Sequence, residues 1–223
     1  MDKYSILKQY YGHSAFRAGQ EELIDSILSG RDALCVMPTG GGKSLCYQVP
    51  ALLLPGLTLV ISPLISLMKD QVAALKSAGV PAAYINSSLT GEQIRTVYTR
   101  TRKGAYKLIY VAPERLETNS FLSLMQEMDV SFLAVDEAHC ISQWGQDFRP
   151  SYLGIVDFIN ALPRRPIVAA YTATATKQVQ SDILRLLQLQ SPYRIVTGFD
   201  RPNLYFDVRR PKNKFSALAA LID

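Results

Sequence analysis

Residues 37–44 read MPTGGGKS, and this short stretch decides the fold that we expect. It follows the apolar run ALCVM (33–37) and precedes a segment with helical apolar spacing. Three consecutive glycines allow a tight turn that directs backbone N–H groups toward an anion, and the start of a helix adds partial positive charge. The stretch ends like the phosphate-binding pattern G-x-x-x-x-G-K-[ST], although Met37 stands where that pattern has its first glycine. The alternative is a plain glycine-rich turn before a helix.

Six further apolar runs are spaced along the chain, namely TLVIS (58–62), AAYIN (82–86), KLIYVA (107–112), SFLAVD (131–136), IVAAYTA (167–173) and YRIVTG (193–198). Segments with apolar residues three and four positions apart lie between them, for example 64–79 and 177–189. Strands that alternate with helices predict an α/β domain, a mostly parallel sheet with helices on both faces. Ligands of such folds bind at the carboxyl ends of the strands, so the residues after each strand matter most.

The composition is that of a globular domain. The chain has 223 residues, 48% of them hydrophobic, and no apolar run is long enough to span a bilayer. The first residues lack the pattern of a signal peptide, and three widely spaced cysteines form no metal-binding pattern. These features predict reduced thiols and a cytoplasmic location. The net charge of +5 permits a nucleic-acid partner without requiring one.

Two acidic residues follow the fifth run. Asp136 ends SFLAVD and Glu137 comes next. An acid at a strand end beside a phosphate loop can hold Mg²⁺, and a second acid can orient and deprotonate an attacking water. In the loop itself, Lys43 can reach phosphates and the Ser44 hydroxyl can ligate Mg²⁺. The alternative for the acidic pair is a solvated cap at the start of a helix.

Several motifs together resemble one family. PTGGGKS (38–44) and DEAH (136–139) resemble motifs I and II of superfamily-two helicases, in which the loop commonly reads x-x-T-G-x-G-K-[ST]. Met37 is therefore no departure from that family. The further segments YGHSAFRAGQ (11–20), VISPLISLMKDQV (60–72), YVAPERL (110–116), DEAHCISQWGQDFRPSY (136–152), YTATAT (171–176) and GFDRPNL (198–204) resemble motifs of RecQ DNA helicases. The resemblance covers essentially the whole chain.

This resemblance implies a RecA-like P-loop NTPase domain over residues 1–208 and a linker over 209–223 toward a second RecA-like domain. It implies ATP and Mg²⁺ as cofactors, and hydrolysis that drives 3′-to-5′ unwinding of DNA in repair and recombination, an activity of the isomerase class. Single-stranded DNA and 3′-tailed duplexes are the implied partners of a monomeric, nucleoid-associated bacterial protein. Because an arginine finger in the second domain contributes strongly to hydrolysis, we expect this chain alone to hydrolyse ATP weakly and not to unwind DNA.

The resemblance also implies roles for single residues at the nucleotide. Gln20 would read the adenine edge, Arg17 would support the nucleotide, and His13 stands where the family usually has a stacking tyrosine. The residues implied to bind ATP are His13, Arg17, Gln20, Thr39, Gly40, Gly41, Gly42, Lys43 and Ser44. The residues implied in catalysis are Lys43, Asp136 and Glu137, with Ser44 and Asp136 as the Mg²⁺ ligands.

Aromatic residues beside a cation in QWGQDFRP suit stacking on the bases of a single strand. In the family, this aromatic-rich loop senses DNA and signals to the ATP site, and Gln146 stands where a histidine is usual. The residues implied in DNA contact or coupling are Ser62, Pro113, Arg115, His139, Gln143, Trp144, Gln146, Phe148, Arg149, Thr172 and Thr174. A basic run from Arg95 to Lys107 reads mainly as a solvated helix face, and phosphate binding is the lesser alternative.

Two other functions stay open at this point. One is an RNA helicase of the same superfamily, because the DEAH tetrad is shared with such proteins. The segment SPLISL and the aromatic-rich loop favour DNA. The other is a non-catalytic ATP-binding module, against which the intact Lys43, Asp136 and Glu137 argue.

Overall fold

One parallel β-sheet forms the centre of the fold. The computed structural model describes residues 1–198, 207–208 and 210–221. Within them, seven strands hydrogen-bond in the order β3-β4-β2-β5-β6-β1-β7, and every neighbouring pair is parallel. The strands are β1 (Ala33–Val36), β2 (Leu57–Ile61), β3 (Ala82–Ile85), β4 (Leu108–Val111), β5 (Val130–Val135), β6 (Ile167–Thr172) and β7 (Tyr193–Val196). All seven apolar runs therefore form strands, and the predicted α/β class is confirmed.

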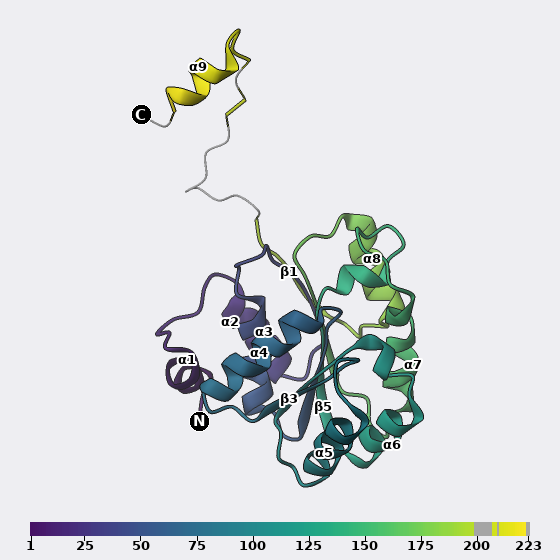
Figure 1. Ribbon diagram of the computed structural model, residues 1–223. Coiled ribbons are helices and arrows are strands. Elements are labelled where there is room, and N and C mark those ends of the chain that lie inside the picture. Colours follow the sequence, from purple (N-terminus) through teal and green to yellow (C-terminus); the bar gives the residue numbers. More distant parts are fainter. Residues whose placement is uncertain (199–206, 209, 222–223) are drawn as a thin grey trace.

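Helices cover both faces of this sheet, as Figure 1 shows. The helices are α1 (Lys3–Tyr11), α2 (Gln20–Leu28), α3 (Lys43–Leu53), α4 (Ile65–Ser77), α5 (Gly91–Arg102), α6 (Asn119–Glu127), α7 (Gly154–Ala161), α8 (Lys177–Leu186) and α9 (Lys214–Ala219). Helices α2, α3 and α4 contribute to the core on one face, and α5 to α8 contribute to the core on the other. Helix α1 packs outside α2 and α3, where Ile6 meets Ile24 and Val49.

Strand β5 shows why the central runs are continuously apolar. Phe132 and Ala134 point into the core beneath α2–α4, whereas Leu133 and Val135 point into the core beneath α5–α8. Both faces of the strand are buried from Phe132 to Val135, and neither set of alternating positions there carries a polar side chain. The first polar side chain after this strand is Asp136, and it comes at the carboxyl end of the sheet.

The predicted basic helix face is only partly correct. Arg95, Arg100 and Arg102 lie on α5, but Lys107 lies beyond that helix, immediately before β4. Its amine donates to the carbonyl oxygens of Leu54 and Gly56. Lys107 therefore satisfies backbone acceptors at the amino-terminal edge of the sheet, which removes it from any continuous phosphate-binding surface.

The C-terminal segment is described only in part. Most of GFDRPNL (198–204) and of the strand-like run after it lies outside the described residues, as does position 209 at the predicted domain boundary. Helix α9 buries none of its residues. In the described part of the chain, no helix combines the length and the apolar character that crossing a membrane requires.

Candidate functional site

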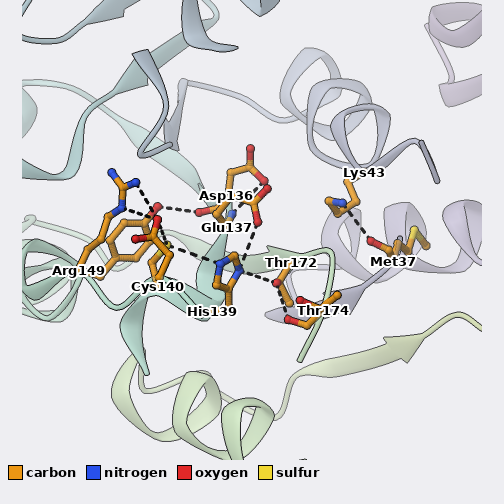
Figure 2. Close-up of polar contacts among 11 residues, drawn as sticks. Met37, Lys43, Asp136, Glu137, His139, Cys140, Arg149, Thr172 and Thr174 are labelled. Carbon is orange, nitrogen blue, oxygen red and sulfur yellow. Dashed lines mark hydrogen bonds and ion pairs between the residues drawn. The ribbon is translucent and has the colours of Figure 1, made fainter. Parts of the chain in front are cut away.

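The glycine-rich stretch forms the connection between β1 and α3. Gly40 and Gly42 have φ values of 81° and 83°, in the left-handed region that residues with a side chain avoid. Lys43 is the first residue of α3, so the loop leads directly into a helix N-terminus, the kind of place where anions bind. The Lys43 amine donates to the carbonyl oxygen of Met37 at 3.0 Å (Figure 2). The loop thus has the backbone geometry and the cation that phosphate binding needs.

The segment before α2 braces this loop from outside. Arg17 Nη1 donates to the Gly40 oxygen at 2.6 Å. Gln20 is buried, and its amide nitrogen lies 3.2 Å from the carbonyl oxygens of both Gly41 and Gly42. Its amide oxygen accepts from Arg17 N at 2.9 Å. The Gln20 amide is therefore fully engaged with protein groups, so reading an adenine edge requires it to exchange partners.

A cavity of about 420 Å³ opens beside the loop. It brings together two segments far apart in sequence, the loop after β1 and the acidic pair after β5. Of the residues proposed for the nucleotide site, those that line the cavity are His13, Arg17, Gln20, Thr39, Gly40, Gly42, Lys43, Ser44, Asp136 and Glu137. Ala15, Leu45 and Leu67 also line it, and the sequence motifs gave no reason to single them out. Gly41 is not among the lining residues.

Asp136 is a buried carboxylate at the floor of this site, with only 7% of its surface exposed. Its Oδ1 accepts from Glu137 N at 3.0 Å, and its backbone oxygen accepts from the Tyr152 hydroxyl at 2.9 Å. Burial, together with the nearby charge of Glu137, raises the pKa of Asp136 to about 6. Glu137 has a φ of 46°, a conformation that is strained for a residue with a side chain. Such strain is common at functional sites.

His139 links the acidic pair to the end of β6 (Figure 2). The Thr172 hydroxyl donates to the Thr174 carbonyl at 3.0 Å, so it accepts from His139 Nδ1, 2.9 Å away. The same nitrogen lies 3.3 Å from Glu137 Oε2. Hydrogen bonding to Cys140, and then to Glu137, raises the pKa of His139 to about 10. The hydrogen bond from His139 in turn lowers the pKa of Glu137, so the two form an ion pair at neutral pH.

The aromatic-rich loop, residues 142–149, follows this histidine. Its tip is open, because Trp144 is 75% exposed, and Gln143 and Gln146 are also exposed, whereas Phe148 is half-buried. Arg149 closes the loop: its backbone N–H donates to the Cys140 oxygen at 2.9 Å and its Nη1 to the Pro63 oxygen at 3.1 Å. Arg149 also pairs with Asp147 at 2.8 Å, a partner that sequence reasoning missed. A loop whose aromatic tip is exposed while its ends are held in place is suited to stacking on nucleotide bases.

Other residues expected to contact DNA differ in how far their side chains are exposed. Ser62, Pro113 and Thr172 are buried, so the structure does not bring their side chains to the surface of this domain. They lie at the carboxyl ends of three strands, where contact with DNA through main-chain groups stays a prediction. Thr174 is exposed, and Arg115 is half-buried, with Nη2 donating to the Asn86 oxygen at 3.3 Å.

Solved structures with a similar fold are helicases. A hypothetical ATP-dependent RNA helicase from Sulfolobus tokodaii superposes with a TM-score of 0.65 over 86% of this chain and 56% of that one, at 18% identity. The DUF1998 helicase MrfA bound to DNA superposes with a TM-score of 0.70 over 88% of this chain and 28% of that one, at 15% identity. At these identities the likeness concerns the fold alone, and it is that of a RecA-like helicase domain.

Sequence relatives are closer. The chain is 51% identical to the ATP-dependent DNA helicase RecQ of Bacillus subtilis over 94% of this chain and 36% of that protein. It is 50% identical to the protein of the same name from Haemophilus influenzae over 98% of this chain and 35% of that protein. The chain thus spans about a third of the length of these relatives, and it corresponds to their first motor domain. Residues 17–182 match the family model described as DEAD/DEAH box helicase. The chain therefore belongs to the DEAD/DEAH box helicase family.

Proposed function

We propose that this chain is the ATP-binding first motor domain of a RecQ-like 3′-to-5′ DNA helicase that acts in repair and recombination. One observation carries the proposal: a single cavity gathers Lys43 and Ser44 from the phosphate loop with Asp136 and Glu137 from the acidic pair. The identity of about 50% to bacterial proteins named as RecQ DNA helicases supports the same conclusion.

The loop would hold the phosphates of ATP. Lys43 now donates to the Met37 carbonyl oxygen, and a phosphate oxygen would offer its amine a charged acceptor in place of that neutral one. Thr39, Gly40 and Gly42 would contribute backbone N–H groups to the same phosphates, and Gly41 would do so by releasing the Pro38 oxygen to which its N–H now donates. His13, Arg17 and Gln20, which line the same cavity, would face the base and the sugar.

The residues present also fit a magnesium ion, held by Ser44 and Asp136. Asp136 is a buried carboxylate whose pKa is raised by burial, so a cation beside it would relieve an unfavourable charge. When bound, Mg²⁺ would neutralise charge on the phosphate oxygens. Glu137 stays ionised because His139 lowers its pKa, and it would orient the attacking water and accept its proton.

The aromatic-rich loop would contact single-stranded DNA, including the tail of a 3′-tailed duplex. Trp144 and Phe148 offer faces for stacking, and Arg149 offers positive charge. His139, which reaches both Glu137 and Thr172, lies between this loop and the acidic pair. We further propose a monomer that works with a second RecA-like domain and, as a bacterial DNA helicase, lies in the cytoplasm at the nucleoid. Alone, this chain would hydrolyse ATP weakly and would not unwind DNA.

Titration with a fluorescent ATP analogue, with Mg²⁺ present, tests the nucleotide site. Lys43→Ala should weaken binding by about 100-fold, because it removes a charge-assisted contact to phosphate. Lys103→Ala, a change of the same type at an exposed position after α5, should bind like the wild type. Equal nucleotide affinities of the two variants would contradict a role of the phosphate loop in ATP binding.

Competition between DNA and RNA tests the proposed preference for DNA. Binding of a labelled oligo-dT should be displaced more readily by unlabelled DNA than by RNA of the same length. A steady-state ATPase assay with single-stranded DNA should show a turnover far below the range of about 1–1,000 s⁻¹ of complete enzymes. Stronger displacement by RNA would favour an RNA helicase, and turnover within that range would contradict weak hydrolysis.

A further inference from the structure

A buried hydrogen bond fastens the aromatic-rich loop to helix α8. The Ser142 hydroxyl donates to Asp182 Oδ2 at 2.7 Å, and the two residues are 0% and 6% exposed. The hydroxyl oxygen of Ser142 also accepts from Trp144 N at 3.2 Å. One side chain at the root of the loop therefore connects the carboxylate of α8 to the backbone of the residue at the tip.

Helix α8 is itself continuous with the segment that His139 contacts. It begins at Lys177, and Thr176 caps it by accepting from Val179 N at 3.3 Å. Thr172, four residues before that cap, accepts from His139. The short turn from His139 to Ser142 is thus tied at both ends to a single stretch of chain, residues 172–186. A shift of the loop would therefore also move the surroundings of His139, which contacts Glu137.

Arg149 holds the far end of the loop by donating to the Cys140 and Pro63 oxygens, and Ser142 holds the near end, from which the tip departs. A cavity of about 310 Å³ lies between the loop and α8, with Gln143, Trp144, Phe148 and Gln178 among its walls, so the loop stands off the helix there. Within the loop, Gly145 N donates to Ser142 O at 2.9 Å. A Cβ at Gly145 would lie 2.3 Å from the His139 oxygen, so the backbone must turn tightly just after Ser142. The direction of the tip is set largely where Ser142 is held.

We propose that Asp182 is a positioning residue: through Ser142 it sets the orientation of the aromatic-rich loop that single-stranded DNA contacts. This inference rests on the proposed DNA-binding function of the loop. A carboxylate is a stronger acceptor than a neutral group, and in a buried site its hydrogen bond is not exchanged easily for water. Asp182 touches neither nucleotide nor Trp144 itself, so it acts by fixing the place from which the tip departs.

The chain provides its own probe, because Trp144 is its only tryptophan. Asp182→Ala and Ser142→Ala should each change the acrylamide quenching constant and the near-ultraviolet circular dichroism of Trp144 without DNA. The double variant should resemble Ser142→Ala, which by itself removes the bond to Asp182 and also the acceptor of Trp144 N. Arg185→Ala is the matched control: Arg185 pairs with Asp182 at 3.1 Å, but its side chain is 70% exposed, so little should change.

Measurements of oligo-dT and nucleotide affinity then distinguish a positioning role of Asp182 from a general loss of structure. Asp182→Ala should bind labelled oligo-dT about tenfold more weakly, while its affinity for a fluorescent ATP analogue stays within about twofold of the wild type. Asp182→Asn, which keeps an acceptor oxygen, should bind oligo-dT with an affinity between those of the wild type and Asp182→Ala. Asp182→Asn provides the test if Asp182→Ala does not fold, because Ser142→Ala also removes the acceptor of Trp144 N.

Three results would overturn the proposal. One is an unaltered Trp144 signal in both single variants. Another is unaltered oligo-dT binding by them. The third is an equal loss of oligo-dT and nucleotide affinity, which would mean that α8 merely supports the fold. If the wild type bound no oligo-dT, the proposed function would fail instead, and the quenching data taken without DNA would still test the contact between loop and helix.

Discussion

The Tyr171 hydroxyl donates to the backbone oxygen of Cys46 at 3.1 Å, both groups being buried. Helix α3 contains Pro50, which has no N–H to give to the residue four positions earlier, and that residue is Cys46. A side chain of β6 thus satisfies the carbonyl that a proline leaves without its helical partner. The contact joins the helix after the phosphate loop to the strand that ends at Thr172.

Tyr171→Phe should therefore lower the free energy of unfolding by about 1–3 kcal/mol, because it leaves a buried carbonyl without a donor while keeping the ring. Urea denaturation measures this change. Tyr84→Phe, a partly buried tyrosine on the edge strand β3, is the control and should alter stability by less. Equal stability of wild type and Tyr171→Phe would mean that the Cys46 oxygen finds another donor.

Asp136 should limit the stability of the protein in the absence of nucleotide and metal. Its pKa is raised from 3.8 to about 6, so its ionised form disfavours the folded state above pH 6, and this penalty disappears below pH 4. The difference corresponds to at most about 3 kcal/mol. Asp136→Asn should gain up to that amount in unfolding free energy at pH 8 and almost nothing at pH 4. Denaturation at both pH values in EDTA measures the gain, with the exposed Asp157→Asn as control.

Asp32 immediately precedes β1, at the amino ends of the strands, and should contribute strongly to the stability of the fold. It is buried and accepts from Arg165 at 2.6 Å and 3.1 Å, and from the backbone of Val168 and Gln190. Asp32→Ala removes the acceptor of the Val168 and Gln190 N–H groups and the ion-pair partner of Arg165, and should cost about 3–5 kcal/mol of stability. Asp129→Ala removes the neighbouring but exposed pair with Arg164 and should cost less than about 1 kcal/mol. Thermal or urea unfolding compares the two, and similar losses would contradict this assignment.

Gln20 has two candidate roles, which one measurement separates. As a brace, its amide holds the loop carbonyls of Gly41 and Gly42. As a reader of adenine, it would favour ATP over GTP. If the brace dominates, Gln20→Ala should weaken ATP and GTP binding by the same factor. A selective loss for ATP, seen in parallel titrations with fluorescent analogues, would show that Gln20 contacts the base.

The strands and the phosphate loop could be predicted because their signals are local. Continuous apolar runs mark buried strands, and the glycines with Lys43 mark an anion-binding turn. The burial of Ser62 and Thr172 could not be predicted, because a small hydroxyl at the carboxyl end of a strand suits a surface as well as a core. The contact of Ser142 with Asp182 spans 40 residues, and that of Cys46 with Tyr171 spans 125. Such pairs depend on how helices pack, which no local pattern reports.

The position of β1 in the sheet has a consequence for how the protein is made. This strand, which leads into the phosphate loop, pairs with β6 and β7, and Ala33 meets Ala169 and Tyr193. Both neighbours are synthesised long after β1, and pairings between such distant segments form slowly. A growing chain on the ribosome therefore carries an unsupported phosphate loop until about residue 196 has emerged. The phosphate loop comes early in the sequence and is among the last motifs to become functional.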